Sequence, residues 1–179
     1  MKSTICEVTK MPDRLIEENG RYALDCHNAL WATDQIHAAY QRAKVRLNDV
    51  DFVLETENLL ILVEYKNAQI CGAAHPELFN PHDDKRADVI WRKYFDSLHY
   101  LTLKGKTKPK HYVYILEYPN GDATARRRLR VRIKKDLPFS LHTELNIDSE
   151  VVSEFSVLSI QEWNDHEVYG KFPLVPVTT

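Results

Sequence analysis

Residues 49–66 of the chain decide its fold, and they read DVDFVLETENLLILVEYK. Asp51 to Leu54 forms an apolar run headed by an acid, and Leu59 to Val63 gives five consecutive aliphatic residues. The first run predicts a strand, and the second predicts a strand that is buried on both faces. The four polar residues between the runs predict a tight turn centred on Glu57 and Asn58.

A hairpin folded about this turn places Asp51 opposite Glu64, and Asp49 opposite Lys66. Because side chains alternate along a strand, these four residues share one face of the sheet. Two carboxylates directly opposite each other on a sheet repel, and a divalent cation would offset that repulsion. Mg²⁺ is commonly held by one or two carboxylates together with waters and a phosphate. A neighbouring lysine could then orient or deprotonate a water, or stabilise charge on the phosphate.

Asp51 followed after twelve residues by Glu64-Tyr65-Lys66 resembles the motif of the PD-(D/E)xK nuclease superfamily, which includes many restriction and repair nucleases. Val50 stands where the motif's proline would be, and the close resemblance covers residues 47–67. The resemblance implies an α/β fold with a mixed central β-sheet flanked by helices. It also implies a restriction endonuclease-like core in the order helix–three strands–helix–strand.

The implied activity is Mg²⁺- or Mn²⁺-dependent hydrolysis of phosphodiester bonds, with DNA as the first candidate substrate. In this family pattern Asp51 and Glu64 hold the cation together with the backbone carbonyl of Tyr65, and Lys66 positions or activates the attacking water. The resemblance further implies an acid on a helix that precedes the sheet. The sequence offers several candidates and does not choose among them: Glu17, Glu18, Asp25 and Asp34.

The remaining elements follow from hydrophobic spacing and turn residues. Helices are predicted for 12–19, for 21–46 with a second start at Thr33-Asp34, and for 85–103 behind the cap Asp83-Asp84. Strands are predicted for 111–118 and for 155–163, the latter entering a turn at 164–165, and the third core strand is the least distinct. The polar segment 67–84 is expected to be a loop with a short strand near 69–71. Its two histidines, His75 and His82, are expected to be exposed residues or phosphate contacts.

A basic run, RRRLRVRIKK, occupies residues 126–135. As a strand it would align one row of cations, and as a helix it would carry an apolar stripe through Ala125, Leu129, Ile133 and Leu137. In either form it can bind nucleic-acid phosphates, or it can be a solvated basic face balanced by acids elsewhere. The predicted nucleic-acid contacts are Arg126, Arg128, Arg130, Arg132 and Lys134, with Lys85 and Arg86 from the helix at 85–103.

The composition is that of one globular domain spanning residues 1–179, with 44% hydrophobic and 28% charged residues. No apolar run approaches the length of a membrane span, and the first residues lack the apolar region of a signal peptide, so a cytoplasmic location and no membrane partner are expected. Cys6, Cys26 and Cys71 form no C-x-x-C pair and predict neither a disulfide framework nor a zinc site. Only five glycines are present, and no Rossmann or phosphate-loop motif is found.

Two other functions are consistent with the same residues. The chain could be a nucleic-acid-binding domain on this fold that does not cleave, or a protein-interaction domain in which the paired acids are structural. Dependence on a divalent cation separates a nuclease from both. The sequence leaves open whether the chain is a monomer or a homodimer, and whether its partner is DNA or RNA.

Overall fold

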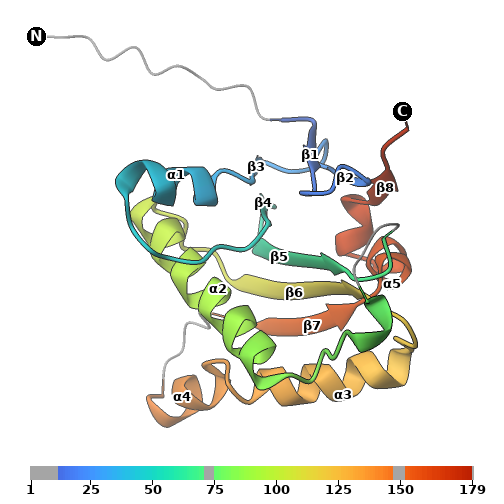
Figure 1. Cartoon of the computed structure of the whole chain (residues 1–179). Coiled ribbons are helices and arrows are strands. Elements are labelled where there is room, and N and C mark those ends of the chain that lie inside the picture. The colour runs from blue at the N-terminus through green and yellow to red at the C-terminus, as the bar shows by residue number, and fades with distance from the viewer. Residues whose placement is uncertain (1–11, 71–74, 147–151, 179) are drawn as a thin grey trace, which may run out of the picture.

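A five-stranded mixed sheet forms the centre of the computed structural model, which describes residues 12–70, 75–146 and 152–178 (Figure 1). Its strands run in the order β3 (Trp31–Thr33), β4 (Phe52–Glu55), β5 (Leu60–Asn67), β6 (Lys110–Glu117) and β7 (Glu154–Leu158). The β3–β4 and β4–β5 pairs are antiparallel, whereas β5, β6 and β7 are mutually parallel. The predicted α/β class with a mixed central sheet flanked by helices is therefore confirmed.

The β4–β5 hairpin has the register predicted from the sequence. Phe52 pairs with Val63 and Glu55 pairs with Leu60, so the turn is centred on residues 57 and 58. Thr56 closes the turn: its N–H donates to the Leu59 carbonyl at 2.9 Å, and its hydroxyl oxygen accepts from the Leu59 N–H at 3.1 Å. The first residues of β5 are fully buried, as expected for a strand covered on both faces.

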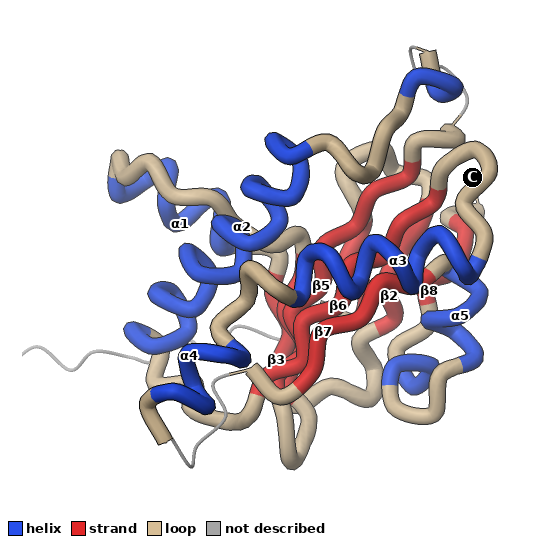
Figure 2. Tube along the Cα trace, turned by 90° about the horizontal axis from the view of Figure 1, so that it is seen from below, coloured by secondary structure: helices blue, strands red, loops and turns tan. Residues whose placement is uncertain are grey.

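Three helices cover one face of the sheet. They are α1 (Ile36–Ala43), α2 (Asp84–Leu103) and α3 (Ala123–Lys134), and the short α4 (Phe139–Glu144) follows α3. Each helix contributes buried side chains to one hydrophobic cluster, among them Ile36, Tyr94 and Leu129. The strands contribute every second side chain to the same cluster, for example Leu62 and Tyr112. Helix α3 packs against β7, and Figure 2 shows it in front of the sheet.

A second, smaller sheet covers the other face. β1 (Arg14–Ile16), β2 (Tyr22–Asp25) and β8 (Leu174–Pro176) are antiparallel, and β2 lies between the other two. Together with α5 (Ile160–Asp165) and the 3₁₀ turn η2 (Tyr169–Lys171), they bury a second cluster against the sheet that includes Leu24, Trp163 and Leu174. The beginning and end of the described chain thus meet on this side (Figure 1).

Two helix predictions in the N-terminal third are wrong. The segment 12–19 contains strand β1 and a turn, and the segment 21–46 contains β2, β3 and only one helix, α1. The apolar residues of 21–33 are spaced like a helical stripe, but β2 gains its hydrogen bonds from β1 and from β8, about 150 residues away. The predicted helix start at Thr33-Asp34 lies close to the observed first residue of α1, Ile36.

The second half of the chain follows the sequence prediction more closely. Helix α2 begins behind the cap Asp83, whose side chain accepts from the Lys85 N–H, and β6 matches its predicted strand. The last predicted strand is correct only in its first part: β7 ends at Leu158, and Ser159 caps helix α5 where the strand was expected to continue to Trp163. The run 126–135 resolves as helix α3 rather than a strand. Between β5 and α2 the described residues hold the 3₁₀ turn η1 (Pro76–Leu78) and no strand.

The strand predicted near 69–71 is absent from Gln69 and Ile70, while Cys71 lies outside the described residues, as does Cys6. Cys26 is buried with a free thiol. Among the described residues, no helix combines the length and apolar character needed to cross a membrane.

Candidate active site

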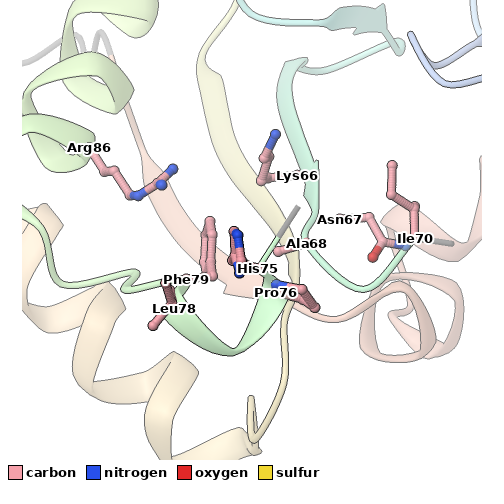
Figure 3. A pocket seen from close by; sticks show the side chains of 9 residues that line it. All are labelled: Lys66, Asn67, Ala68, Ile70, His75, Pro76, Leu78, Phe79 and Arg86. Carbon is pink, nitrogen blue, oxygen red and sulfur yellow. The ribbon is translucent and has the colours of Figure 1, made fainter. Parts of the chain in front are cut away.

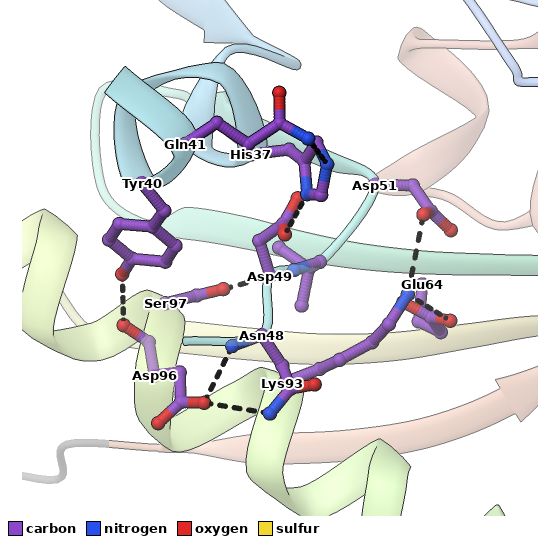
Figure 4. Close-up of polar contacts among 11 residues, drawn as sticks. His37, Tyr40, Gln41, Asn48, Asp49, Asp51, Glu64, Lys93, Asp96 and Ser97 are labelled. Atoms are coloured by element: carbon purple, nitrogen blue, oxygen red, sulfur yellow. Dashed lines mark hydrogen bonds and ion pairs between the residues drawn. The ribbon is translucent and has the colours of Figure 1, made fainter. Parts of the chain in front are cut away.

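Asp51, directly before β4, and Glu64, within β5, lie side by side, and an ammonium group joins them (Figure 4). The Lys93 Nζ lies 2.8 Å from each Glu64 carboxylate oxygen and 3.5 Å from Asp51 Oδ1. Glu64 is 6% exposed, on the face that α2 covers. The predicted juxtaposition of the two acids is thus present, with a cation between them that comes from α2.

Burial dominates the ionisation of this group. Burial, reinforced by the Asp51 charge and opposed by Lys93, raises the pKa of Glu64 to about 8. Burial also raises the pKa of Asp51, although Lys93 and the Tyr65 N–H act against it. For Lys93, burial favours the neutral amine, but the Glu64 and Asp51 carboxylates outweigh it and raise the pKa. The two acids therefore need positive charge nearby to be ionised together.

Helix α2 also fixes the loop that carries Asp51 (Figure 4). The Asp96 carboxylate accepts from the Asn48 N–H at 2.8 Å, and the buried Ser97 hydroxyl oxygen accepts from the Val50 N–H at 3.0 Å. Beyond this loop, the Tyr65 N–H donates to Asp51 Oδ2 at 2.6 Å. Asp51 is consequently held from α2 on one side and from β5 on the other.

An acidic cavity of about 470 Å³ opens beside Asp51, between the 47–52 loop, α1 and the β1–β2 turn. Asp49 lines it and lies 3.0 Å from His37 Nδ1. The predicted Asp49–Lys66 pair is not among the contacts of either residue in the described chain. The other cavity-lining groups that carry charge are Asp51, Lys93, Glu17, Glu18 and Asp34.

The four candidate upstream acids differ in their surroundings. Glu17 is buried, and its carboxylate accepts from the Asn19 and Arg21 N–H groups at 2.7 and 2.6 Å, so it stabilises the β1–β2 turn. Asp25 contacts His27 and does not line the cavity. Glu18 is exposed and its negative charge contributes to the raised pKa of Asp51. Glu18 and Asp34 both line the cavity, and the Asp34 carboxylate also accepts from the Gln35 side-chain amide at 2.5 Å.

Lys66 lies on the opposite side of the carboxylate pair from the acidic cavity. It lines a cavity of about 440 Å³ with Glu64 and Lys93, and a neighbouring one of about 400 Å³ with Arg86. Among the described residues, Lys66 makes no side-chain hydrogen bond or ion pair. Its ammonium group is thus adjacent to the acids without being neutralised by them.

The predicted phosphate contacts divide into free and engaged groups. Arg126 is 8% exposed, with its guanidinium paired with Glu162 at 2.7 Å, which makes it a structural residue. Arg132 bonds to Asp84 and to the His82 carbonyl, and Lys134 lies 4.4 Å from the Phe139 ring centroid. The exposed cations of the predicted set are Arg128 and Arg130 on α3, and Lys85 and Arg86 on α2.

Lys93 is a site residue that the sequence prediction missed. A signal was available: Lys93 follows Ile90 by three residues and precedes Ser97 by four, so it lies beside the buried stripe of α2. A lysine in that place faces the sheet, where only acids can balance its charge.

The donor atoms fit a hard cation in kind. The two carboxylates of Asp51 and Glu64 lie next to each other. The N–H and C=O of one strand residue point to the same side of the strand. Because the Tyr65 N–H donates to Asp51, the Tyr65 carbonyl also faces the side where Asp51 lies. Within residues 12–70, 75–146 and 152–178, no three acid, histidine or cysteine side chains are grouped closely enough to ligate a metal by themselves. A cation here would rely on the two acids, the carbonyl and water.

Comparison with known proteins gives no relative: no protein family, curated protein or solved structure matches the chain.

Proposed function

We propose that the chain is a nuclease that hydrolyses phosphodiester bonds, with DNA as its substrate and Mg²⁺ or Mn²⁺ as its cofactor. The observation that carries the proposal is the Asp51–Glu64 pair, two adjoining carboxylates of which one is almost fully buried. A pair of this kind is destabilising unless positive charge is close, and Lys93 meets that need in the absence of other cations.

Each residue has a distinct role in this proposal. Asp51, Glu64 and the Tyr65 carbonyl would hold the divalent cation, which supplies a polarised phosphate oxygen and an acidified water. Lys66, on the same face of β5 and without a partner in the described chain, would orient the attacking water or stabilise charge on the phosphate. Lys93 would neutralise the acids in the free protein.

The order of elements supports the resemblance to the PD-(D/E)xK superfamily, with one departure. α1, β4, β5, α2 and β6 follow one another as helix, strands, helix and strand. The third strand of the expected core is not found between β5 and α2 in the described residues, and β3, which borders β4, precedes α1. The hairpin and the helix that covers it carry the whole proposed site.

The test is cleavage of plasmid, linear and single-stranded DNA by the purified protein with Mg²⁺, Mn²⁺ or EDTA. We expect cleavage with the cations and none in EDTA, and loss of cleavage in Glu64→Gln and Lys66→Ala variants that remain folded. Arg92→Gln, an exposed change on α2, is the matched control. Full activity of Lys66→Ala, or cleavage in EDTA, would contradict the mechanism.

A second function, a protein-interaction or DNA-binding domain that does not cleave, is favoured by one observation. Lys93 already contacts both acids, so the three residues could be a closed structural ion cluster. In that case divalent cations would leave the melting temperature of the wild-type protein unchanged. A nuclease of the proposed kind should melt higher with Mg²⁺ or Mn²⁺ than in EDTA, because the cation binds only the folded chain.

A further inference from the structure

A cavity of about 400 Å³ lies beyond Lys66, at the end of β5 (Figure 3). Its walls come from the last residues of β5, from the segment 75–79 and from the first turn of α2. Lys66 and Arg86 are its charged side chains, with His75 and Asn67 as further polar groups, and none of the described lining residues is acidic. The cavity beside Asp51, in contrast, is lined by five acids.

Arg86 is held in place by an aromatic ring. Its guanidinium carbon lies 4.5 Å from the Phe79 ring centroid. The Phe79 ring packs in turn against the Tyr118 ring, with 5.8 Å between the two ring centroids. A guanidinium stacked on a ring keeps its N–H donors free at its edge, where they match the oxygens of a phosphate. Among the described residues, the Arg86 side chain donates to no acceptor, unlike the guanidinium groups of Arg126 and Arg132.

Lys66 adds a second cation to the same cavity, from a different element. Arg86 comes from α2 and Lys66 from β5, with Phe79 and His75 between them in Figure 3. Both cations also line the neighbouring cavity that contains Glu64, so the two spaces adjoin. Glu64 and Asn67, which lines the cavity, lie three residues apart on β5, which corresponds to about 10 Å at about 3.3 Å per residue. A nucleic-acid strand that passes the carboxylates can therefore reach this cavity within a few nucleotides.

From this geometry we infer that the cavity of Arg86, His75 and Phe79, which Lys66 borders on the side of the carboxylates, is a phosphate-binding subsite for the nucleic-acid substrate. It receives a phosphate a few nucleotides from the bond that is cleaved, either a terminal phosphate or one within the strand. The inference rests on the proposed function for the identity of the ligand, and on the cavity itself for the binding of phosphate. Arg86 is a binding residue here, with no part in bond cleavage.

The test measures binding without cleavage. Fluorescently labelled 12-mer oligonucleotides bearing a 5′-phosphate, a 3′-phosphate or no terminal phosphate are titrated in EDTA with the wild type and with Arg86→Gln, Arg86→Lys and Arg92→Gln. We expect Arg86→Gln to weaken binding about tenfold, which corresponds to loss of one hydrogen-bonded charge contact. Arg86→Lys should recover part of the loss, because it keeps the charge but lacks the planar fork. Arg92→Gln should bind like the wild type.

The three oligonucleotides distinguish the source of the phosphate. If the Arg86→Gln loss occurs only with one terminal phosphate, the subsite holds a strand end; if it is equal for all three, the subsite holds an internal phosphate. Equal affinity of wild type and Arg86→Gln for all three would overturn the subsite, as would absence of binding. Arg86-dependent binding without cation-dependent cleavage would support the subsite and refute the nuclease activity. Cation-dependent cleavage without Arg86-dependent binding would support the nuclease activity and refute the subsite.

Discussion

Lys93 is a partly buried lysine whose ion pairs with Asp51 and Glu64 bear on both stability and the proposed site. Its ammonium contacts two carboxylates, and its side chain is 22% exposed, while that of Glu64 is 9% exposed. Removing one partner from such a cluster leaves charge in a poorly hydrated place, which costs far more than breaking a surface ion pair. The residue therefore links the stability of the fold to the ionisation of the proposed site.

We predict that Lys93→Met lowers the free energy of unfolding in EDTA by about 3 kcal/mol at a pH above the Glu64 pKa of about 8, where both acids are ionised and then repel without a counter-charge. Mg²⁺ or Mn²⁺ should restore more stability to this variant than to the wild type, since the cation takes over the lost charge. Chemical denaturation with and without cation measures both effects. Arg92→Met on the same helix is the control, and a Lys93→Met variant as stable as the wild type in EDTA would refute this account.

The raised pKa of Glu64 predicts a pH dependence of stability. Because the folded chain binds the Glu64 proton more tightly than the unfolded chain, stability in EDTA should fall as the pH rises from about 4.5 to about 8. The slope is at most about 1.4 kcal/mol per pH unit for one proton. Denaturation curves across this range should show the decline in the wild type and a smaller one in Glu64→Gln. A slope of the same size in both proteins would assign the pH dependence to other groups.

At the scale of elements, α2 determines where Asp51 lies. Ser97 is fully buried and its hydroxyl oxygen is the acceptor for the Val50 N–H, so Ser97→Ala leaves a buried donor without a partner. We expect a loss of about 1–3 kcal/mol of stability and weaker cation binding, because the 48–51 loop is then less firmly held. Thermal melts with increasing Mn²⁺ measure both. Ser140→Ala, on the exposed side of α4, should change neither.

The basic helix α3 offers a test of nucleic-acid contact that is independent of cleavage. Arg128→Gln and Arg130→Gln together should flatten the dependence of log affinity on log salt by up to about 1.8, at about 0.9 per phosphate contact to duplex DNA. Lys171→Gln, on the other side of the sheet, should leave the slope unchanged. An unaltered slope in the double variant would identify α3 as a solvated basic face. Arg126 is unsuitable for this test because its pairing with Glu162 makes it structural.

The elements differ in how far the sequence could predict them. The hairpin was predictable to its register, because a continuous aliphatic run, a polar turn and a second apolar run leave one way to fold. Strands β1, β2 and β3 were not, since each has only three or four residues and depends on distant partners. Lys93 was missed for a related reason: its contacts with Asp51 and Glu64 span 42 and 29 residues. Local patterns carry no record of which distant side chains meet.

At the scale of the whole molecule, the C-terminal strand β8 completes the layer on the face opposite the proposed site. Leu174 is 1% exposed in the second hydrophobic cluster and pairs with Leu24. We predict that Leu174→Ala costs about 2–4 kcal/mol of stability through the cavity it creates, while the stabilisation by cations stays as in the wild type. Leu141→Ala, at a side chain exposed on α4, is the control. Loss of the cation effect in Leu174→Ala would show that the two faces are coupled.

Helix α2 touches three parts of the proposed site within a short length. Arg86 faces the subsite, Lys93 the carboxylates, and Asp96 and Ser97 the loop that carries Asp51. Eleven residues separate Arg86 from Ser97, about 16 Å along a single rigid rod. If substrate binding at Arg86 displaces α2, Lys93 and the residues that hold the Asp51 loop would move with it. Substrate binding would then change the surroundings of both carboxylates.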